Sequence, residues 1–404
     1  MIDYPDPETQ ESSNAVVDFS NTEIAFHHKT DKELKKSAWL FSVMNKSWLV
    51  DAFTPLGLLA VKLHLPFVSS IIKATIYEQF VGGTALLKSQ KTIDLLSENK
   101  VLSILDYGAE AKSSEKDFNH TMNECIRSID FAATNESVPV VSAKITGLAR
   151  FGLLERIQKG VSLNKEMKKE YRNVLKRMDA ICHVANDRKV GVFFDSEESW
   201  IQDSIDHLVE IMMKRYNTKK VIVYNTFQMY RHDRLQYLID SFDRANKGGY
   251  MLGAKLVRGA YMEKERARAE DLGYASPIYT SKQATDDAYN TALRFCVDNY
   301  KKIASCNATH NQESCLLLAE LIAQKKIPKN HSHLNFCQLY GMSDNITFNL
   351  AAQGYNVAKY LVYGSVQDVV PYLSRRAKEN SAVAGDMSRE YALVMTEIKR
   401  RAKG

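Results

Sequence analysis

Two adjacent arginines, Arg375 and Arg376, are the residues of this chain best suited to chemistry. They lie in a segment, 366–380, that has a helical pattern and follows an apolar run and a Gly-Ser turn. A guanidinium is always charged and donates paired hydrogen bonds that match a carboxylate. We therefore expect this segment, which we call the clamp helix, to bind a small carboxylated substrate.

The spacing within the clamp helix allows two explanations. Adjacent residues are about 100° apart around a helix, so the two arginines do not share a face and could bracket a ligand. Tyr372, Arg375 and Glu379 do share a face. The alternative is therefore a surface ion pair between Arg375 and Glu379, which would contribute only about 0.3–0.5 kcal/mol.

The elements that must position this helix form an alternating pattern after residue 100. Short β-rich apolar runs alternate with amphipathic segments such as 198–216, whose apolar residues recur at helical spacing. This alternation is typical of an α/β protein and predicts a (β/α)8 TIM barrel. An open doubly wound sheet is the competitor, although no G-x-G-x-x-G or Walker loop is present. The predicted strands are 101–107, 138–145, 190–195, 220–228, 251–258, 304–309, 333–339 and 357–363.

Polar residues gather at the carboxyl ends of these runs, where barrel enzymes place their active sites. Lys144 lies in an apolar run, and a buried lysine is costly unless it is paired. It either reaches the rim or is kept for an anionic ligand. His310, between Thr309 and Asn311, is either a satisfied rim histidine or a hydrogen-bond donor to a cofactor.

An acidic group follows the third run. Asp195, Glu197 and Glu198 have no neighbouring histidines, so salt bridges or helix N-terminal charges are favoured over a metal site. The six cysteines have no C-x-x-C spacing and are expected to be reduced, mostly buried thiols that bind no zinc.

The composition excludes one class of function. Of the 404 residues 45% are hydrophobic, which is ample for a large core. The net charge is +6, from 54 basic and 48 acidic residues that are interspersed. This mild excess lacks the footprint of a nucleic-acid-binding protein.

Three regions are expected along the chain. Residues 1–30 are expected to be poorly ordered, 31–99 to form a helical arm, and 100–404 to form the barrel. The start has no apolar signal core and no Arg-rich amphipathic pattern, so either the chain is not targeted or a targeting segment has been removed. Charged residues interrupt the apolar region 37–85, so no membrane-spanning helix is expected there. Its helices pack in the core, or they form an arm that touches a membrane surface or a partner.

With these motifs in this order, the chain resembles the proline dehydrogenase family. Residues 372–380 read Y-L-x-R-R-x-x-E-N, and the segments K-L-V-R-G-A-Y at 255–261, A-T-H-N at 308–311 and Q-L-x-G-M at 338–342 precede them. Residues 77–81 are similar to the eukaryotic, mitochondrial branch. The resemblance implies a distorted barrel that binds FAD and oxidises L-proline to Δ1-pyrroline-5-carboxylate by hydride transfer to flavin N5. It also implies transfer of electrons to a ubiquinone-type acceptor and peripheral association with the inner mitochondrial membrane on its matrix side.

The resemblance further implies roles for individual residues. Lys144, Arg375 and Arg376 correspond to the groups that bind the proline carboxylate. Glu110 corresponds to an acid that pairs with Arg375 and gates the site, and Asp195 matches a nearby acidic position. The walls around the pyrrolidine ring correspond to Tyr360, Tyr372, Leu256, Ala260, Tyr261 and Leu339. The FAD contacts correspond to Gln228, Lys255, Val257, Arg258, Gly259, Ala260, Thr285, Thr309, His310, Asn311, Gln338 and Glu379.

Some positions depart from the bacterial members of that family. Lys255 replaces an arginine that contacts the flavin, Met262 replaces a tryptophan, and Cys337 stands where a glutamine would. We expect the fold and the proline chemistry to hold despite these changes. The resemblance also implies that Tyr360 packs near the ring carbon that carries the hydroxyl group of hydroxyproline. The related hydroxyproline oxidases have a small residue there, so a tyrosine is expected to favour proline.

Three other functions stay open at this point. A hydroxyproline dehydrogenase would share the resemblance, and a non-catalytic binding barrel would share the scaffold. A phosphate-binding barrel aldolase would need a late catalytic lysine and a Gly-rich loop, of which Gly364-Ser365 is a poor version.

Overall fold

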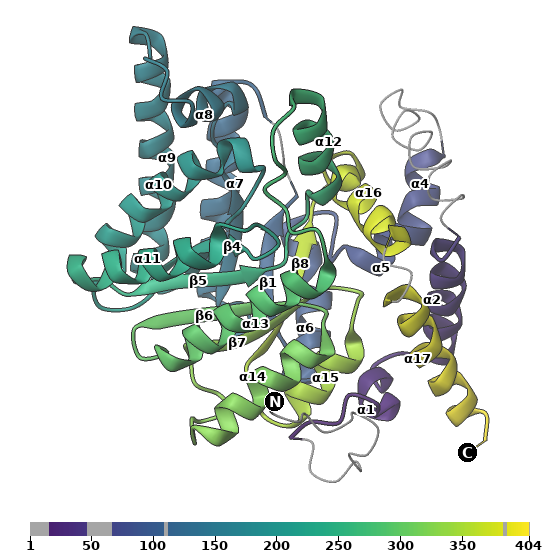
Figure 1. Cartoon of the computed structure of the whole chain (residues 1–404). Helices are drawn as coiled ribbons and strands as arrows, with labels where there is room; N and C mark the ends of the chain where they lie inside the picture. The colour runs from purple at the N-terminus through teal and green to yellow at the C-terminus, as the bar shows by residue number, and fades with distance from the viewer. Residues whose placement is uncertain (1–15, 47–66, 109–111, 383–385, 404) are drawn as a thin grey trace.

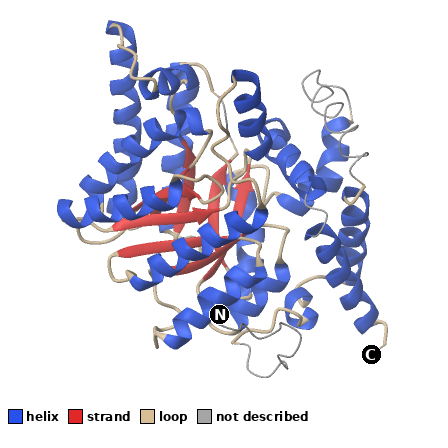
Figure 2. Ribbon diagram, viewed as in Figure 1, coloured by secondary structure: helices blue, strands red, loops and turns tan. Residues whose placement is uncertain are grey.

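The computed structural model describes residues 16–46, 67–108, 112–382 and 386–403 (Figure 1). Eight parallel strands close into one barrel in chain order, with helices around it (Figure 2). The barrel is confirmed and the open sheet is wrong, because β1 pairs with β8 from Leu102 opposite Ala358 to Tyr107 opposite Tyr363. The strands are β1 (Leu102–Tyr107), β2 (Val140–Lys144), β3 (Gly191–Asp195), β4 (Val223–Gln228), β5 (Leu252–Val257), β6 (Ile303–Ala308), β7 (Leu334–Leu339) and β8 (Val357–Tyr363).

The strands are continuous apolar runs because both of their faces are buried. Outward side chains pack beneath the helices, inward ones fill the barrel, and β8 is buried at every position. The outer layer contains α6 (Gln90–Glu98), α7 (Glu115–Ala133), α8 (Phe151–Gln158), α9 (Lys165–Arg188), α10 (Ser199–Tyr216), α11 (Arg234–Gly248), α12 (Met262–Leu272), α13 (Lys282–Asp298), α14 (Gln312–Gln324) and α15 (Asp344–Ala352).

The eighth helix departs from a regular barrel. The helix α16 (Val366–Ala382) follows β8 but packs mainly against the π-helical turn η1 (Lys73–Tyr77), α2 (Asp31–Met44) and α17 (Asp386–Arg401), while α6 covers β1. The clamp helix expected at 366–380 is α16. Because its partners come from both ends of the chain, these end segments set its position (Figure 1).

The described part of the arm is helical and is fixed to the barrel. It contains α2, which begins with a Thr30–Glu33 capping box, α4 (Val68–Ile72), η1 and α5 (Glu78–Phe80). Gln79 Nε2 donates to Gly341 O at 2.8 Å, and Tyr77 OH donates to Gly364 O at 2.7 Å. These carbonyls follow β7 and β8, so the arm lies against the carboxyl end of the barrel.

Residues 16–30 differ from the expectation of a poorly ordered start. Thr22–Phe26 form helix α1, and Asn345 and Asn349 of α15 donate to the carbonyls of Phe19 and Asn21 at 3.2 and 3.1 Å. Residues 1–15 lie outside the described residues. Within the described part of the chain, no helix is long and apolar enough to cross a membrane.

Candidate active site

The centre of the barrel's carboxyl end is organised around Asp195, the last residue of β3. Its carboxylate accepts hydrogen bonds from Lys255 Nζ at 2.7 Å, Tyr360 OH at 2.7 Å and Ser142 Oγ at 3.0 Å. These donors come from β5, β8 and β2, so one carboxylate links four strands. Burial raises the pKa of Asp195, but Lys255 and Lys144 outweigh it and hold that pKa below its usual range.

Lys144 lies at the end of β2 with its side chain almost fully buried. Its Nζ is 3.5 Å from Asp106 Oδ2 and 3.5 Å from Asp195 Oδ2. Two carboxylates thus balance the charge of this lysine, and its role toward an anionic ligand stays a prediction. The pairing also explains how an apolar strand can carry a lysine.

Lys255 and Tyr360 pack on each other as well as on Asp195. Lys255 Nζ lies 4.5 Å from the centre of the Tyr360 ring and 5.4 Å from that of Phe193. Burial, Asp106 and Asp195 raise the pKa of Tyr360 well above its usual value, so its hydroxyl keeps its proton and donates. The ring of Tyr360 is thereby held in one position.

The side chain of Leu256 does not lie where we expected it. We expected it to form part of the wall around a substrate ring, but its side chain belongs to the outer core between strands and helices. Successive side chains of a strand alternate between its faces, so the neighbour of the inward Lys255 faces outward. Leu339, by contrast, packs against the inner cluster that contains Tyr360 and Tyr372.

A second group of residues fixes Arg258 just after β5. Its guanidinium donates to Asp286 at 2.7 Å, Thr309 at 2.6 Å and Ser314 at 3.0 Å, and it covers the Tyr289 ring at 4.4 Å. Burial raises the pKa of Asp286, but bonds from Lys282 and Arg258 lower it overall. The structure thus brings together predicted cofactor contacts from β5 and β6, with Thr285 beside Asp286 on α13.

Two glutamines complete this group. Gln338 Nε2 donates to Thr309 O at 3.1 Å, and its Oε1 accepts from Thr347 at 2.9 Å. Gln228 Nε2 donates to Glu197 O at 3.0 Å. Its buried Oε1 has no hydrogen-bond partner among the described residues, which is unusual for a buried polar atom and fits a position that receives a ligand's donor.

The segment between these groups needs a glycine. Gly259 has φ +143°, and a Cβ there would lie 2.5 Å from the ring atoms of Tyr230. Val257 precedes it at the end of β5, and Ala260 and Tyr261 follow it at the rim. Asn311 caps α14 by accepting from Ser314 N at 2.8 Å.

The arginines of α16 rest on two different tyrosines. Arg375 lies 6.0 Å from the ring centre of Tyr261, and Arg376 lies 5.4 Å from that of Tyr372. This divergence agrees with their expected separation around the helix. Arg376 is buried. Glu110 and the side chain of Glu379 lie outside what the structure describes, so the gating pair and the Arg375–Glu379 pair stay predictions.

The acidic neighbours of Asp195 have separate partners. Thr146 donates to Glu197 through its backbone at 3.0 Å and through its hydroxyl, and Glu198 pairs with Lys264. Burial raises the pKa of Glu197 to about 7 despite those bonds. Among the described residues, no group of three or more His, Cys, Asp or Glu side chains could hold a metal ion.

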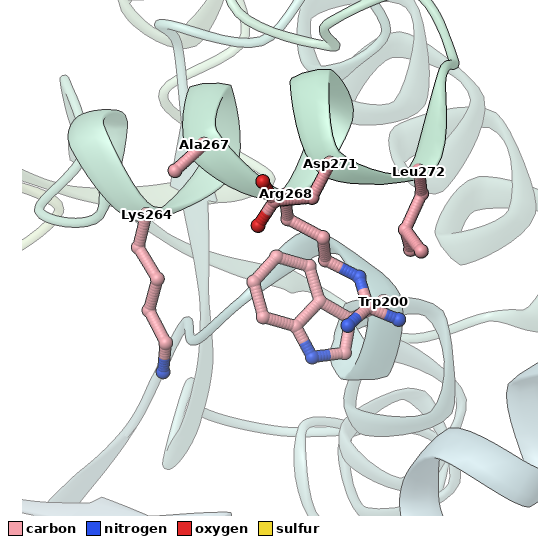
Figure 3. Close-up of a pocket in the computed structure, with 6 residues that line it drawn as sticks. All are labelled: Trp200, Lys264, Ala267, Arg268, Asp271 and Leu272. Atoms are coloured by element: carbon pink, nitrogen blue, oxygen red, sulfur yellow. The ribbon is translucent and has the colours of Figure 1, made fainter.

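A pocket of about 310 Å³ lies where α10 and α12 meet, outside the barrel, and its lining residues are drawn in Figure 3. Its centre is Trp200, whose ring is covered by Arg268 at 4.3 Å and approached by Lys264 at 5.7 Å. No predicted site residue lines it. The constellation inside the barrel, and not this pocket, has the chemistry of a site.

Sequence reasoning assigned no role to several polar partners. Asp106, Ser142 and Asp286 anchor the predicted residues, and Ser343 contacts His310. Asp106 directly follows an apolar run at a barrel rim, and this signal could have identified it. The others come from elements whose contacts only the fold defines.

The barrel and its charged carboxyl end define a class of protein, the barrel enzymes. In structure the chain is similar to proline utilization A (PutA) from Bdellovibrio bacteriovorus, with a TM-score of 0.73 and 21% identity over 90% of this chain and 41% of that one. This similarity concerns the fold.

The sequence comparisons identify the family. The proline dehydrogenase family model matches residues 89–389, so the chain belongs to that family. It is 30% identical over 325 residues to the carbapenem antibiotics biosynthesis protein CarD of Pectobacterium carotovorum, covering 80% of this chain and 84% of that protein. It is 32% identical over 374 residues to the mitochondrial proline dehydrogenase 1 of Dictyostelium discoideum, covering 82% of this chain and 65% of that protein. The resemblance to the eukaryotic type is thereby confirmed.

Proposed function

We propose that this protein is an FAD-dependent proline dehydrogenase that oxidises L-proline to Δ1-pyrroline-5-carboxylate, the first step of proline catabolism. The observation that carries this proposal is the family match over residues 89–389, which spans the barrel and the arginines of α16. The residues at the carboxyl end of the barrel supply the groups that such a reaction needs.

The substrate carboxylate binds to Arg375, Arg376 and Lys144. Charge-assisted hydrogen bonds from several cations hold a planar anion in one orientation. Arg375 is partly exposed beside Tyr261, Arg376 is buried, and only 11% of the Lys144 side chain is exposed. These two largely covered cations favour the anion because little water competes with it there.

FAD is held by the group that surrounds Arg258. The support for this assignment is a guanidinium fixed by three hydrogen bonds and a buried Gln228 Oε1 that lacks a protein donor within the described residues. FAD bound there would supply a hydride acceptor, the flavin N5, for oxidation at the Cδ of the substrate. The residues themselves align substrate and cofactor and exclude water; none is required as an acid–base pair.

Tyr360 makes proline the preferred substrate over 4-hydroxyproline. Its hydroxyl is bonded to Asp195 at 2.7 Å and to Ser142 at 3.0 Å, and its ring is buried. The side chain therefore cannot swing away to admit a larger ring substituent without losing both bonds.

The electrons pass to a ubiquinone-type acceptor, and the protein acts in mitochondria, bound peripherally to the matrix side of the inner membrane. Relatives such as the Dictyostelium protein are named mitochondrial. The arm exposes Trp39, Phe67 and Ile71, with Phe67 79% accessible. Exposed apolar side chains on helices favour contact with a lipid surface, where the quinone is dissolved.

Turnover with a quinone analogue tests the proposal. The purified protein loaded with FAD should reduce the analogue only when L-proline is present, and o-aminobenzaldehyde should trap Δ1-pyrroline-5-carboxylate in equal amount. Quinone reduction without this product, or equal activity with an unrelated amino acid, would refute the assignment.

A further inference from the structure

His310 is linked to the C-terminal helix through one hydroxyl group. The residue follows β6, and its Nδ1 lies 2.9 Å from Oγ of Ser343, in the loop after β7. Oε1 of Glu390, on α17, accepts from Ser343 N at 3.0 Å and from Ser343 Oγ at 3.3 Å. Arg389 also donates to His310 O at 3.2 Å. A helix near the end of the chain thus contacts a predicted cofactor residue through its backbone and, through Ser343, its ring.

The protons of this chain of hydrogen bonds can be assigned. A serine hydroxyl has one proton. Burial raises the pKa of Glu390, but Arg389 lies 3.7 Å from its Oε1 and favours the ionised carboxylate, which can only accept the serine proton. With its proton committed to Glu390, Ser343 Oγ accepts from His310. The Nδ1 of His310 must then be protonated.

The charges around His310 keep its ring neutral. Burial is the largest cause that lowers the pKa of His310, and the nearby cations Lys359, Arg376, Arg389 and Arg258 lower it further. The pKa of His310 therefore lies well below its usual value. The carboxylate of Glu390 is separated from the ring by the Ser343 hydroxyl, and Asp344 is engaged by Lys29 and Lys359 at 2.9 Å each. A neutral ring with Nδ1 protonated has a lone pair on Nε2.

The backbone of Ser343 supports a role for its hydroxyl. This residue has φ +51°, a left-handed conformation that favours glycine, yet a side chain is present and fully buried. Strain of this kind is kept where a side chain is needed at one position.

We infer that Ser343 and Glu390 are positioning residues that hold His310 as the neutral Nδ1–H tautomer, so that Nε2 accepts a hydrogen bond from a hydroxyl or N–H group of a flavin dinucleotide. The cofactor half of this inference rests on the proposed function. The tautomer half rests on the protein alone.

Long-range ¹H–¹⁵N spectra of the full chain, labelled in histidine and recorded without cofactor, test the tautomer. His310 is assigned from a His310→Gln sample. The wild-type ring should be protonated at Nδ1, and Glu390→Ala should release the Ser343 hydroxyl and shift the proton toward Nε2. Glu390→Gln keeps an acceptor oxygen and should keep the wild-type tautomer. A wild-type ring protonated at Nε2, or an unchanged ring in Glu390→Ala, would overturn the inference.

FAD titration of the same variants tests the cofactor half. Glu390→Ala should raise the Kd by about two- to tenfold, the value of one hydrogen bond, and Glu390→Gln should not. Glu397→Ala is the control for damage to α17, because Glu397 is equally buried but pairs with Arg400 and Arg401. Ser343→Gly should weaken binding although it relieves the backbone strain. If Glu397→Ala weakens binding as much as Glu390→Ala, the effect is structural and the inference is wrong. If the wild-type chain binds no FAD at all, the proposed function and the cofactor half both fail, while the tautomer stays measurable.

Discussion

Asp195 shows how single residues define this site. Two carboxylates, Asp106 and Asp195, and two lysines, Lys144 and Lys255, meet inside the barrel with balanced charge. Buried ions are tolerated only when they are paired and hydrogen-bonded. The cluster therefore fixes the side chains of the proposed substrate site in advance, which would lower the entropic cost of binding.

The clamp arginines should control substrate affinity. We expect Arg375→Met and Arg376→Met each to raise the KM for proline by about 10- to 100-fold, since a charge-assisted hydrogen bond contributes about 1.5–3 kcal/mol. Steady-state kinetics of the FAD-loaded variants provide the measurement. Arg127→Met, an exposed arginine of α7 paired with Glu124, is the control and should leave the KM unchanged. A wild-type KM in both clamp variants would remove these arginines from the site.

Tyr360 should determine which ring is oxidised. We expect the wild-type kcat/KM to be higher for L-proline than for trans-4-hydroxy-L-proline, and Tyr360→Ser to narrow the difference because it opens space. Tyr360→Phe keeps the ring but loses the bonds to Asp195 and Ser142 that hold it in place, so it should narrow the difference less than Tyr360→Ser does. A wild-type preference for hydroxyproline would assign the chain to the other substrate.

Glu197 should make stability depend on pH. Its pKa is about 7 in the folded protein, above the ordinary value of 4.5, so the folded state holds this proton more tightly than the unfolded chain. The stability from this group is fully present below pH 4.5 and is lost as the pH rises to about 7. The loss is at most about 3 kcal/mol. Urea unfolding of Glu197→Gln and wild type between pH 5 and 8 measures it, with Glu98→Gln, an exposed glutamate that does not act on Glu197, as the control. If the free energy of unfolding changes with pH in the same way in wild type and in Glu197→Gln, the raised pKa of Glu197 is contradicted.

At the scale of elements, the strands were predictable and the ends of the chain were not. All eight strands appear where the apolar runs were. A strand that is buried on both faces needs apolar residues at nearly every position, and such a run can be recognised in the sequence alone. The helix α1 is short and is held by Asn345 and Asn349, more than 300 residues away. Local sequence contains no signal for such tertiary contacts.

The arm should bind lipid through its exposed apolar side chains. We expect Phe67→Ser combined with Ile71→Ser to reduce co-sedimentation with vesicles of an inner-membrane composition, since burial of such a side chain contributes about 1.5–3 kcal/mol. Leu272→Ser on α12 removes a similarly exposed side chain elsewhere and should change nothing. Undiminished sedimentation of the arm variant would show that another surface meets the membrane.

The whole molecule assembles its site from distant segments. The arm meets the loops after β7 and β8, α17 reaches Ser343, and α16 lies between them. The residues at strand ends could be predicted from the rim rule for barrels. Ser343 and Glu390 could not, because they are 47 positions apart and meet only when α17 folds back. The prediction for Leu256 was wrong for a different reason. A shift of one residue along a strand places the side chain on the opposite face of the sheet.

The most direct test of the account is the visible spectrum of the purified full chain. After incubation with FAD and removal of the excess, the protein should be yellow, with flavin bands that bleach when L-proline is added without oxygen. Arg375→Met with Arg376→Met should keep the bands and bleach only at much higher proline concentration. The account is contradicted if the chain takes up no flavin under any condition, or if its flavin absorption bands do not change when proline is added.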